Sequence, residues 1–158
     1  MSTNSSVPDN STKRAEPELF RGGTLSVSLT VKDLQKSQAW YHDVVGFTID
    51  RKIEREGKLR GVALKAGDVQ LSLNQDDGAK GWDRVKGEGF SLRISTDQSV
   101  DEIANRIKEL GGTLDSEPAD MPWGARIFRL RDPDGFKLTI SSPLPVPLQK
   151  SVRARTPS

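Results

Sequence analysis

The chain has 158 residues, 34% hydrophobic and 29% charged, which is typical of one globular domain and too few for a large multidomain assembly. No apolar run reaches the roughly 18 residues that a transmembrane helix needs. Because cysteine is absent, disulfides, thiolate metal sites and cysteine nucleophiles are excluded. The polar start, MSTNSSVPDNSTKRAEPELF, lacks the apolar core of a signal peptide. We therefore expect a cytoplasmic protein without a membrane partner.

The formal net charge is +2, but the excess positive charge lies near the C-terminus. Residues 142–158 contain Lys150, Arg153 and Arg155 and no acid, whereas residues 1–21 contain equal numbers of bases and acids. The intervening part is therefore slightly acidic. Because nucleic-acid binding depends on a basic surface, we do not expect a nucleic-acid partner for the folded part.

The predicted elements run in the order strand, helix and three strands, and the same order then repeats. The first helix has Asp33 as its N-cap and ends at Gly46; the second opens with a capping box at Ser99 and ends at Gly111. The Asp-Pro-Asp-Gly turn at 132–135 sets the start of the last strand. The strands are predicted, in chain order, at residues 25–31, 47–53, 61–66, 68–74, 90–94, 112–116, 125–131 and 136–141.

The repeated order is supported by internal sequence similarity. GFTI at 46–49 is similar to GGTL at 111–114, and DVQLSLN from Asp68 is similar to KLTIS from Lys137. We interpret the chain as a duplicated βαβββ unit of the α+β class. The predicted division is a disordered tail (1–22), one domain (23–142, with module one at 23–76, a linker at 77–87 and module two at 88–142) and an extended basic tail (143–158).

Each predicted strand has an apolar face and a polar face. On the first strand, Leu25, Val27, Leu29 and Val31 are expected to face the helix and form core. The opposite face carries mainly small uncharged residues, namely Ser26, Ser28, Thr30, Gln70, Ser72, Asn74, Ser91, Thr139 and Ser141, together with Arg93 and Lys137. A solvated face usually collects Lys and Glu, so we favour a lined cavity over a solvated surface.

Two stretches resemble the motifs of one family. VKDLQKSQAWYHDVVGF at 31–47 is close to V-x-D-L-x-x-S-x-x-F-Y-x-x-x-L-G-F, and PWGARIFRLRDPDGFKLTI at 122–140 is close to W-G-x-R-x-F-x-x-x-D-P-D-G-N-x-x-E-L. Residues 25–141 thus resemble the vicinal oxygen chelate superfamily, which includes glyoxalase I, extradiol dioxygenases, fosfomycin-modifying transferases and bleomycin-resistance proteins. The resemblance implies paired βαβββ modules that form an open cleft. In the family's enzymes, His, Gln or Glu on the first, fourth, fifth and eighth strands hold a divalent metal there.

Carried over from the resemblance, the four metal-ligand positions fall on Ser26, Gln70, Gly89 and Thr139. Thr139 stands where the metal enzymes place glutamate. Gln70 alone offers an oxygen, and one neutral amide does not hold a catalytic divalent ion. The single histidine, His42, is interpreted as a partly exposed residue of the first helix. We expect no metal and no other cofactor.

Small-molecule binding is then the favoured function, because the family includes metal-free members that sequester antibiotics such as bleomycin in dimeric clefts. Trp123 is the favoured aromatic contact, whereas Trp82 can instead pin the linker and Phe128 can instead belong to the core. Arg93, beside Gly89, can hold a ligand carboxylate or phosphate, or pair with an acid. The candidate ligand-binding residues are Ser26, Ser28, Gln70, Ser72, Trp82, Arg93, Trp123, Phe128 and Thr139.

Three functions stay open at this point. The first is a metal-independent homodimer that binds an antibiotic or an aromatic metabolite. The second is an enzyme of glyoxalase, dioxygenase or isomerase type with a non-standard site. The third is an interaction module in which the tails, such as residues 142–158, carry the function.

Overall fold

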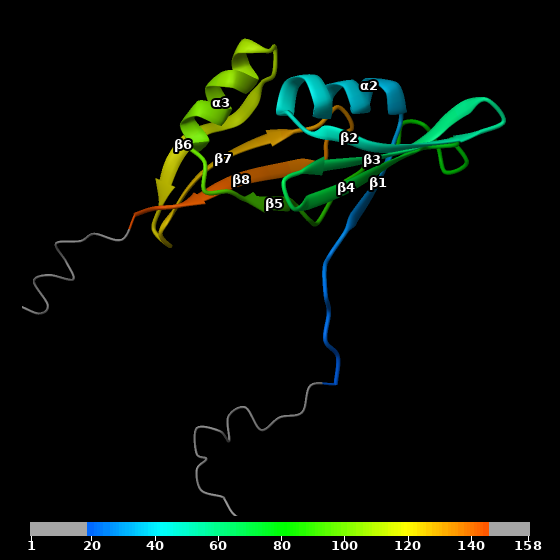
Figure 1. Ribbon diagram of the computed structural model, residues 1–158. Coiled ribbons are helices and arrows are strands. Elements are labelled where there is room, and N and C mark those ends of the chain that lie inside the picture. Colours follow the sequence, from blue (N-terminus) through cyan, green and yellow to red (C-terminus); the bar gives the residue numbers. More distant parts are fainter. Residues whose placement is uncertain (1–18, 146–158) are drawn as a thin grey trace, which may run out of the picture.

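The computed structural model describes residues 19–145, which form two four-stranded sheets with helices packed on one face of each (Figure 1). The predicted tails, 1–22 and 143–158, lie mostly outside the described residues. The elements are β1 (Val27–Val31), α2 (Leu34–Ala39), η1 (Trp40–Val45), β2 (Thr48–Arg55), β3 (Lys58–Ala66), β4 (Val69–Gln75), β5 (Leu92–Ser95), α3 (Val100–Glu109), β6 (Leu114–Met121), β7 (Ala125–Arg131) and β8 (Lys137–Pro143).

The two sheets have the same topology, which confirms the predicted α+β fold of two βαβββ modules. Their strand orders are β1-β4-β3-β2 and β5-β8-β7-β6. In each sheet the first strand pairs in parallel with the last one, with Val27 opposite Leu71 and Leu92 opposite Leu138. The helix between them supplies the crossover that a parallel pair requires.

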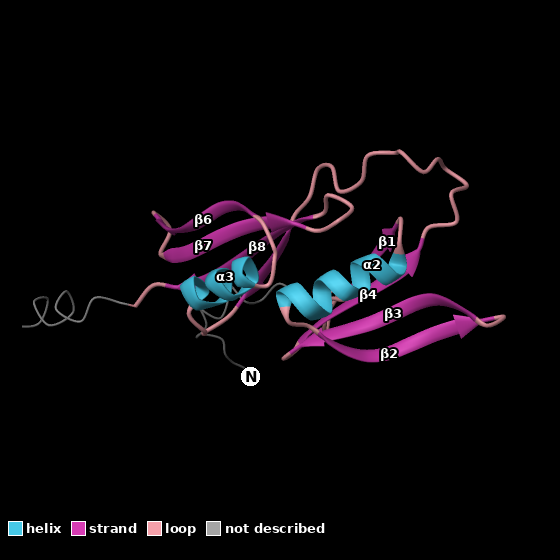
Figure 2. Cartoon of the chain, turned by 90° about the horizontal axis from the view of Figure 1, so that it is seen from above, coloured by secondary structure: helices cyan, strands magenta, loops and turns pink. Residues whose placement is uncertain are grey.

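The helices of both modules lie on the same side of the molecule (Figures 1 and 2). The sheet faces turned away from the helices therefore also point to one common side. We call these the first outer face, on the sheet of β1 to β4, and the second outer face, on the sheet of β5 to β8. The segment that precedes β1 extends away from the body on this side (Figure 1).

The core follows the alternation of apolar residues along the strands. Leu29, Leu73 and Val62 occupy one row of the first sheet beneath α2, and all three are buried. The prediction for Leu25 is wrong, because 89% of this residue is exposed. Pairing of β1 with β4 begins only at Val27, so Leu25 lies beyond the paired sheet.

Both predicted helix starts are confirmed. The side chain of Asp33 accepts a hydrogen bond from Lys36 N, and that of Ser99 accepts one from Glu102 N. The first helix, however, is α-helical only as far as Ala39 and continues as the π-helix η1. There the carbonyl of Tyr41 accepts bonds from the N–H groups of both Gly46 and Phe47, at 2.9 Å each. Gly46, at φ 107°, ends the helix as predicted.

The two modules are joined by a buried contact between a helix and a turn. The hydroxyl of Tyr41, in η1, donates to Asp132 Oδ2 at 2.8 Å across the module boundary. The other carboxylate oxygen of Asp132 accepts bonds from the N–H groups of Asp134 and Phe136, at 2.9 Å each. The Asp-Pro-Asp-Gly turn therefore sets the start of β8 and also anchors module two to module one.

Candidate functional site

The first outer face is polar and mostly uncharged. Ser28 lies opposite Ser72 in the pairing of β1 with β4, and Asn74 donates from Nδ2 to the Ser28 hydroxyl at 2.6 Å. Gln70 lies opposite Lys65 at the end of the same sheet. Ser26 directly precedes β1 and is exposed. The structure thus brings four predicted ligand-binding residues from two distant stretches of the sequence onto one surface, namely Ser26, Ser28, Gln70 and Ser72.

The second outer face is different because it is cationic. Thr139, in β8, lies between Arg93 of β5 and Arg129 of β7, since it is the pairing partner of both. Only 6% of Thr139 is exposed, whereas both arginines are exposed. Ser141 follows on the same face and is also buried. Of the predicted site residues, this face contains Arg93 and Thr139.

Sequence reasoning missed Arg129 as a site residue. The signal was the alternation in ARIFRLR, which places Ile127, Arg129 and Arg131 on the face opposite to Phe128 and Leu130. What the alternation does not give is the register with β8 that sets Arg129 beside Thr139.

One of the carried-over ligand positions does not lie on a strand. Gly89 precedes β5, which begins at Leu92. Val27 lies opposite Leu71 and Leu92 lies opposite Leu138, so the residue that corresponds to Ser26 in the repeat is Ser91. The positions to compare with metal ligands are therefore Ser26, Gln70, Ser91 and Thr139, all neutral hydroxyl or amide side chains.

The three aromatic candidates are separated by the structure. Phe128 has no exposed surface and packs in the core against the helix side of the sheet, opposite Ile140, so it cannot line a cleft. Trp123 is 56% exposed in the turn between β6 and β7. Trp82 is 48% exposed in the linker, where its indole lies against the backbone of Gly78. Trp82 and Trp123 stay available for contact, and Phe128 does not.

A groove of about 910 Å³ runs between the modules. Its lining includes the apolar side chains of Phe47, Ile94 and Ile140 and the polar residues Gln98 and Arg106. Arg106 already donates to the carbonyl of Val45 at 3.4 Å. None of the predicted ligand-binding residues lines this groove.

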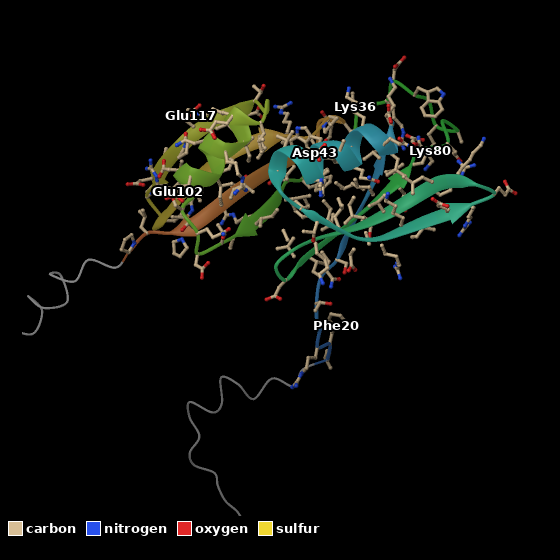
Figure 3. All side chains as sticks on the ribbon, turned by 45° about the horizontal axis from the view of Figure 1, so that its top comes forward. Phe20, Lys36, Asp43, Lys80, Glu102 and Glu117 are labelled. Carbon is tan, nitrogen blue, oxygen red and sulfur yellow. The ribbon has the colours of Figure 1, made fainter. Side chains whose placement is uncertain are left out.

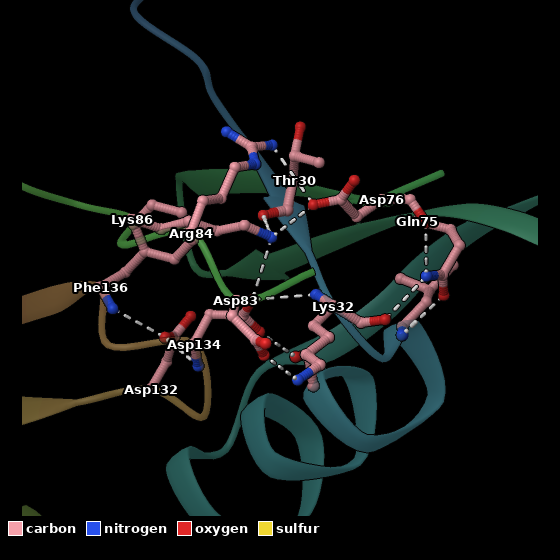
Figure 4. A network of polar contacts seen from close by, with 12 residues as sticks. Thr30, Lys32, Gln75, Asp76, Asp83, Arg84, Lys86, Asp132, Asp134 and Phe136 are labelled. Carbon is pink, nitrogen blue, oxygen red and sulfur yellow. Dashed lines mark hydrogen bonds and ion pairs between the residues drawn. The ribbon is translucent and has the colours of Figure 1, made fainter. Parts of the chain in front are cut away.

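A network of charged residues closes the opposite end of the module boundary (Figure 4). Lys86, in the linker, has only 6% of its side chain exposed, and its Nζ lies 2.8 Å from Asp76 Oδ2 and 3.2 Å from Asp134 Oδ2. It also donates to the carbonyl of Thr30 at 3.1 Å. One ammonium group therefore joins β1, the end of β4 and the turn before β8.

These contacts shift the pKa values of the acids concerned. The hydrogen bond from Lys86 and the N–H of Gly78 lower the pKa of Asp76 to about 2. Burial raises the pKa of Asp132, against the opposing effect of its hydrogen-bond donors. Burial also raises the pKa of the Tyr41 hydroxyl, and the nearby Asp132 charge adds to this effect. These three groups belong to the contacts around the module boundary and not to the outer faces.

The side chains present do not fit a catalytic metal. Among residues 19–145, no group of three His, Asp or Glu side chains is arranged to hold an ion. His42 is exposed on η1, where its Nδ1 lies 2.7 Å from Asp43 Oδ1. The four positions compared with metal ligands, Ser26, Gln70, Ser91 and Thr139, offer hydroxyl and amide oxygens. Zinc and transition-metal sites instead use imidazole, carboxylate or thiolate ligands.

Paired βαβββ modules with helices on one side define a class of proteins with a common fold, and comparison with known proteins identifies the family. The model of the Glyoxalase/Bleomycin resistance protein/Dioxygenase superfamily matches residues 23–140. The chain belongs to this superfamily, as its resemblance to the vicinal oxygen chelate proteins implied. In the described part of the chain, no helix is long and apolar enough to cross a membrane.

Individual relatives are distant. The chain is 27% identical over 122 residues to the lactoylglutathione lyase of Salmonella typhimurium, covering 73% of this chain and 89% of that protein. It is 25% identical to a probable lactoylglutathione lyase of Synechocystis, covering 73% and 92%. Among solved structures, TioX from Micromonospora sp. ML1 superposes with a TM-score of 0.64 at 22% identity, covering 78% of this chain and all of that one. The structural likeness extends to the fold alone.

Proposed function

We propose that this protein is a metal-independent binding protein of the superfamily that takes a small molecule on its outer sheet faces, in the cytoplasm. The observation that carries the proposal is the neutral character of Ser26, Gln70, Ser91 and Thr139, the four positions compared with the metal ligands of the family. These side chains can hydrogen-bond an organic ligand, but they do not supply the charged or imidazole ligands of a divalent ion.

The ligand class that we propose is an antibiotic or an aromatic metabolite. The hydroxyl groups of Ser28 and Ser72 and the amide of Gln70 offer donors and acceptors without charge. Trp82 and Trp123 expose about half of their surface, and an indole ring stacks on flat ligand groups with little loss of rotamer freedom.

We further infer that the protein acts as a homodimer. The segment that precedes β1 carries Leu19, Phe20 and Leu25, all at least 85% exposed, and Phe20 stands away from both modules (Figure 3). Exposed apolar residues that gather on one side mark an interface, and a second copy would cover them and the open outer faces.

The dimer proposal predicts a mass of twice 17.4 kDa by light scattering coupled to gel filtration. Changing both Phe20→Glu and Leu25→Glu is expected to yield monomers, because carboxylates oppose burial in an apolar contact. Val85→Glu, in the linker and 75% exposed, is the matched control and should leave the mass unchanged. A monomeric wild-type protein would contradict the proposal.

Metal content is the primary test of the proposed function. Untagged protein is incubated with Ni, Zn, Mn and Fe(II) salts, desalted and analysed by elemental mass spectrometry. We expect far less than one ion per chain, because the donor set does not fit. A variant with Ser26→His, Gln70→Glu, Ser91→His and Thr139→Glu is the positive control. One ion per wild-type chain would overturn the metal-independent assignment.

Ligand binding is then measured by titration calorimetry with a panel of aromatic compounds and glycopeptides, with and without EDTA. We expect saturable binding that the chelator does not change. Ser72→Phe fills the first outer face and should abolish it, whereas Gln98→Phe, in the groove between the modules, should not. Loss of binding only in Gln98→Phe would place the ligand in the groove instead.

The alternative is an enzyme of glyoxalase, dioxygenase or isomerase type. It is favoured by the names of the distant relatives, two of which are lactoylglutathione lyases. Turnover that EDTA abolishes, together with one bound ion per chain, would support this alternative over the binding protein.

A further inference from the structure

The second outer face contains a row of three residues whose chemistry suits an anion. Arg93, Thr139 and Arg129 come from three neighbouring strands and lie in register across the sheet. Neighbouring strands are about 4.8 Å apart, so the two arginine Cα atoms lie roughly 10 Å apart with Thr139 between them. Both guanidinium groups, at the ends of long side chains, can therefore reach one small group above Thr139.

The arginines of this row are available for a ligand. Within residues 19–145, the side chains of Arg93 and Arg129 make no hydrogen bond and no ion pair. The next basic residue on β7, Arg131, is already engaged, because its Nε donates to Asp115 Oδ2 at 2.9 Å. Lys137 lies opposite Arg131 and adds a further positive charge near the row.

The first outer face shows that this charge is not a general property of the fold. The corresponding row of the first sheet runs across four strands. It consists of Ser28 of β1, Ser72 of β4, Ala63 of β3 and Arg51 of β2. One basic residue at the sheet edge thus replaces the two that flank Thr139. At this height the duplicated modules have diverged, because two arginines flank the central residue of the second sheet and none flanks Ser72 in the first.

We propose that Arg93 and Arg129, with the hydroxyl of Thr139 between them, form a subsite for a carboxylate or phosphate group of the ligand. This assignment deepens the proposed function and rests on it for its biological meaning. A guanidinium group donates two parallel hydrogen bonds to either anion, and an anion relieves the repulsion between two neighbouring cations. Thr139, held nearly buried at the centre of the sheet, supplies a fixed donor at the bottom of the subsite.

The test uses simple anions. Inorganic phosphate and acetate are titrated separately into the ¹⁵N-labelled full chain at constant ionic strength, and the Nε–H signals of the arginines are followed by NMR. We expect saturable shifts at Arg93 and Arg129 and at the amide of Thr139. Arg51, exposed on the other outer face, is the internal control. A preference for phosphate or for acetate distinguishes the two anion classes.

Variants test the contribution of each side chain. Arg93→Gln and Arg129→Gln are each expected to weaken anion binding about tenfold, because each removes one guanidinium group. Thr139→Val keeps the shape of the side chain and removes the hydroxyl, and it should weaken binding by a smaller factor. Arg51→Gln should have no effect. The spectra themselves show whether each variant is folded.

Shifts at Arg93 and Arg129 no larger than those at Arg51 would overturn the subsite. This outcome is distinct from failure of the proposed function. If an organic ligand binds equally well to the wild type and to Arg93→Gln with Arg129→Gln, the subsite is wrong and the binding function stands. If phosphate binds at the row but the protein also holds one stoichiometric metal ion, the metal-independent function is wrong and the subsite stands.

Discussion

Phe128→Ala is expected to lower the free energy of unfolding by about 3–5 kcal/mol. The ring has no exposed surface and packs with Leu130, Leu138 and Ile140 in the core of the second module. Truncation removes its buried apolar area and leaves a cavity that the sheet, fixed by its hydrogen bonds, fills only in part. Urea unfolding followed by circular dichroism measures the loss.

Trp123→Ala is the matched control for this prediction. It removes a larger aromatic side chain from the turn between β6 and β7, but Trp123 is more than half exposed. We expect a change within about 0.5 kcal/mol. If Phe128→Ala kept its stability and instead lost ligand binding, Phe128 would be a cleft residue, contrary to its position in the structure.

Lys86→Met is expected to lower the melting temperature by roughly 10 °C. The substitution removes the one ammonium group that lies between Asp76 and Asp134, and all three side chains are almost fully buried. Two carboxylates are then left close together with too little compensation, although Arg84 still contacts Asp76 at 3.2 Å. Differential scanning calorimetry at neutral pH measures the change.

Lys80→Met, at an exposed linker position, is the control and should change the melting temperature by about 1 °C or less. The difference between Lys86→Met and the wild type should persist in high salt, because salt screens exposed ion pairs far more than buried ones. An unchanged melting temperature for Lys86→Met would show that the network does not hold the modules together.

The loss of folding stability at acidic pH gives a second test of the role of Lys86. The folded-state pKa of Asp76 lies at about 2, below its ordinary value of 3.8. This carboxylate therefore stabilises the fold above pH 3.8, and its contribution is lost as the pH falls from 3.8 to about 2. Because the Lys86 hydrogen bond is the largest cause of the lowered pKa, Lys86→Met should lose less stability across this window than the wild type.

Two other acids, Asp101 and Asp132, also change the stability at low pH, but neither of them contacts Lys86. The hydrogen bonds from Arg126 lower the pKa of Asp101, so the wild type and Lys86→Met share its loss of stability at low pH. Burial raises the pKa of Asp132, so that protonation of this group favours the fold at low pH. The contributions of Asp101 and Asp132 therefore cancel in the difference between the two proteins. Identical losses of stability at acidic pH would contradict the assignment.

Much of the fold could be predicted from local sequence patterns. The helix caps at Asp33 and Ser99, the stop at Gly46 and the strand at 125–131 are all as predicted. Each depends on residues within a few positions of one another, because caps, turns and alternation act through hydrogen bonds and side-chain directions of neighbouring residues. The predicted core position of Leu25 failed for the opposite reason, since the start of sheet pairing depends on a distant strand.

The candidate site was predicted only in part, and the reason is again register. The small polar residues of β1 and β4 could be assigned to one face because alternation fixes which side of a strand each occupies. Alternation does not say which residue of β7 lies beside Thr139, so Arg129 was missed. For Phe128, the sequence leaves both a ligand contact and a core position open, and only the structure, in which it packs with Leu130 and Ile140, decides for the core.

By itself, the sequence determined the duplicated βαβββ order, the helix ends, the polar character of the outer faces and the absence of charged ligands at the metal positions of the family. Only the tertiary structure decided that Phe128 is core, that Lys86 joins three distant segments and that Arg93 and Arg129 flank Thr139. Residue type and periodicity act over short stretches of chain, whereas burial and charge pairing depend on strands and loops that meet only after folding.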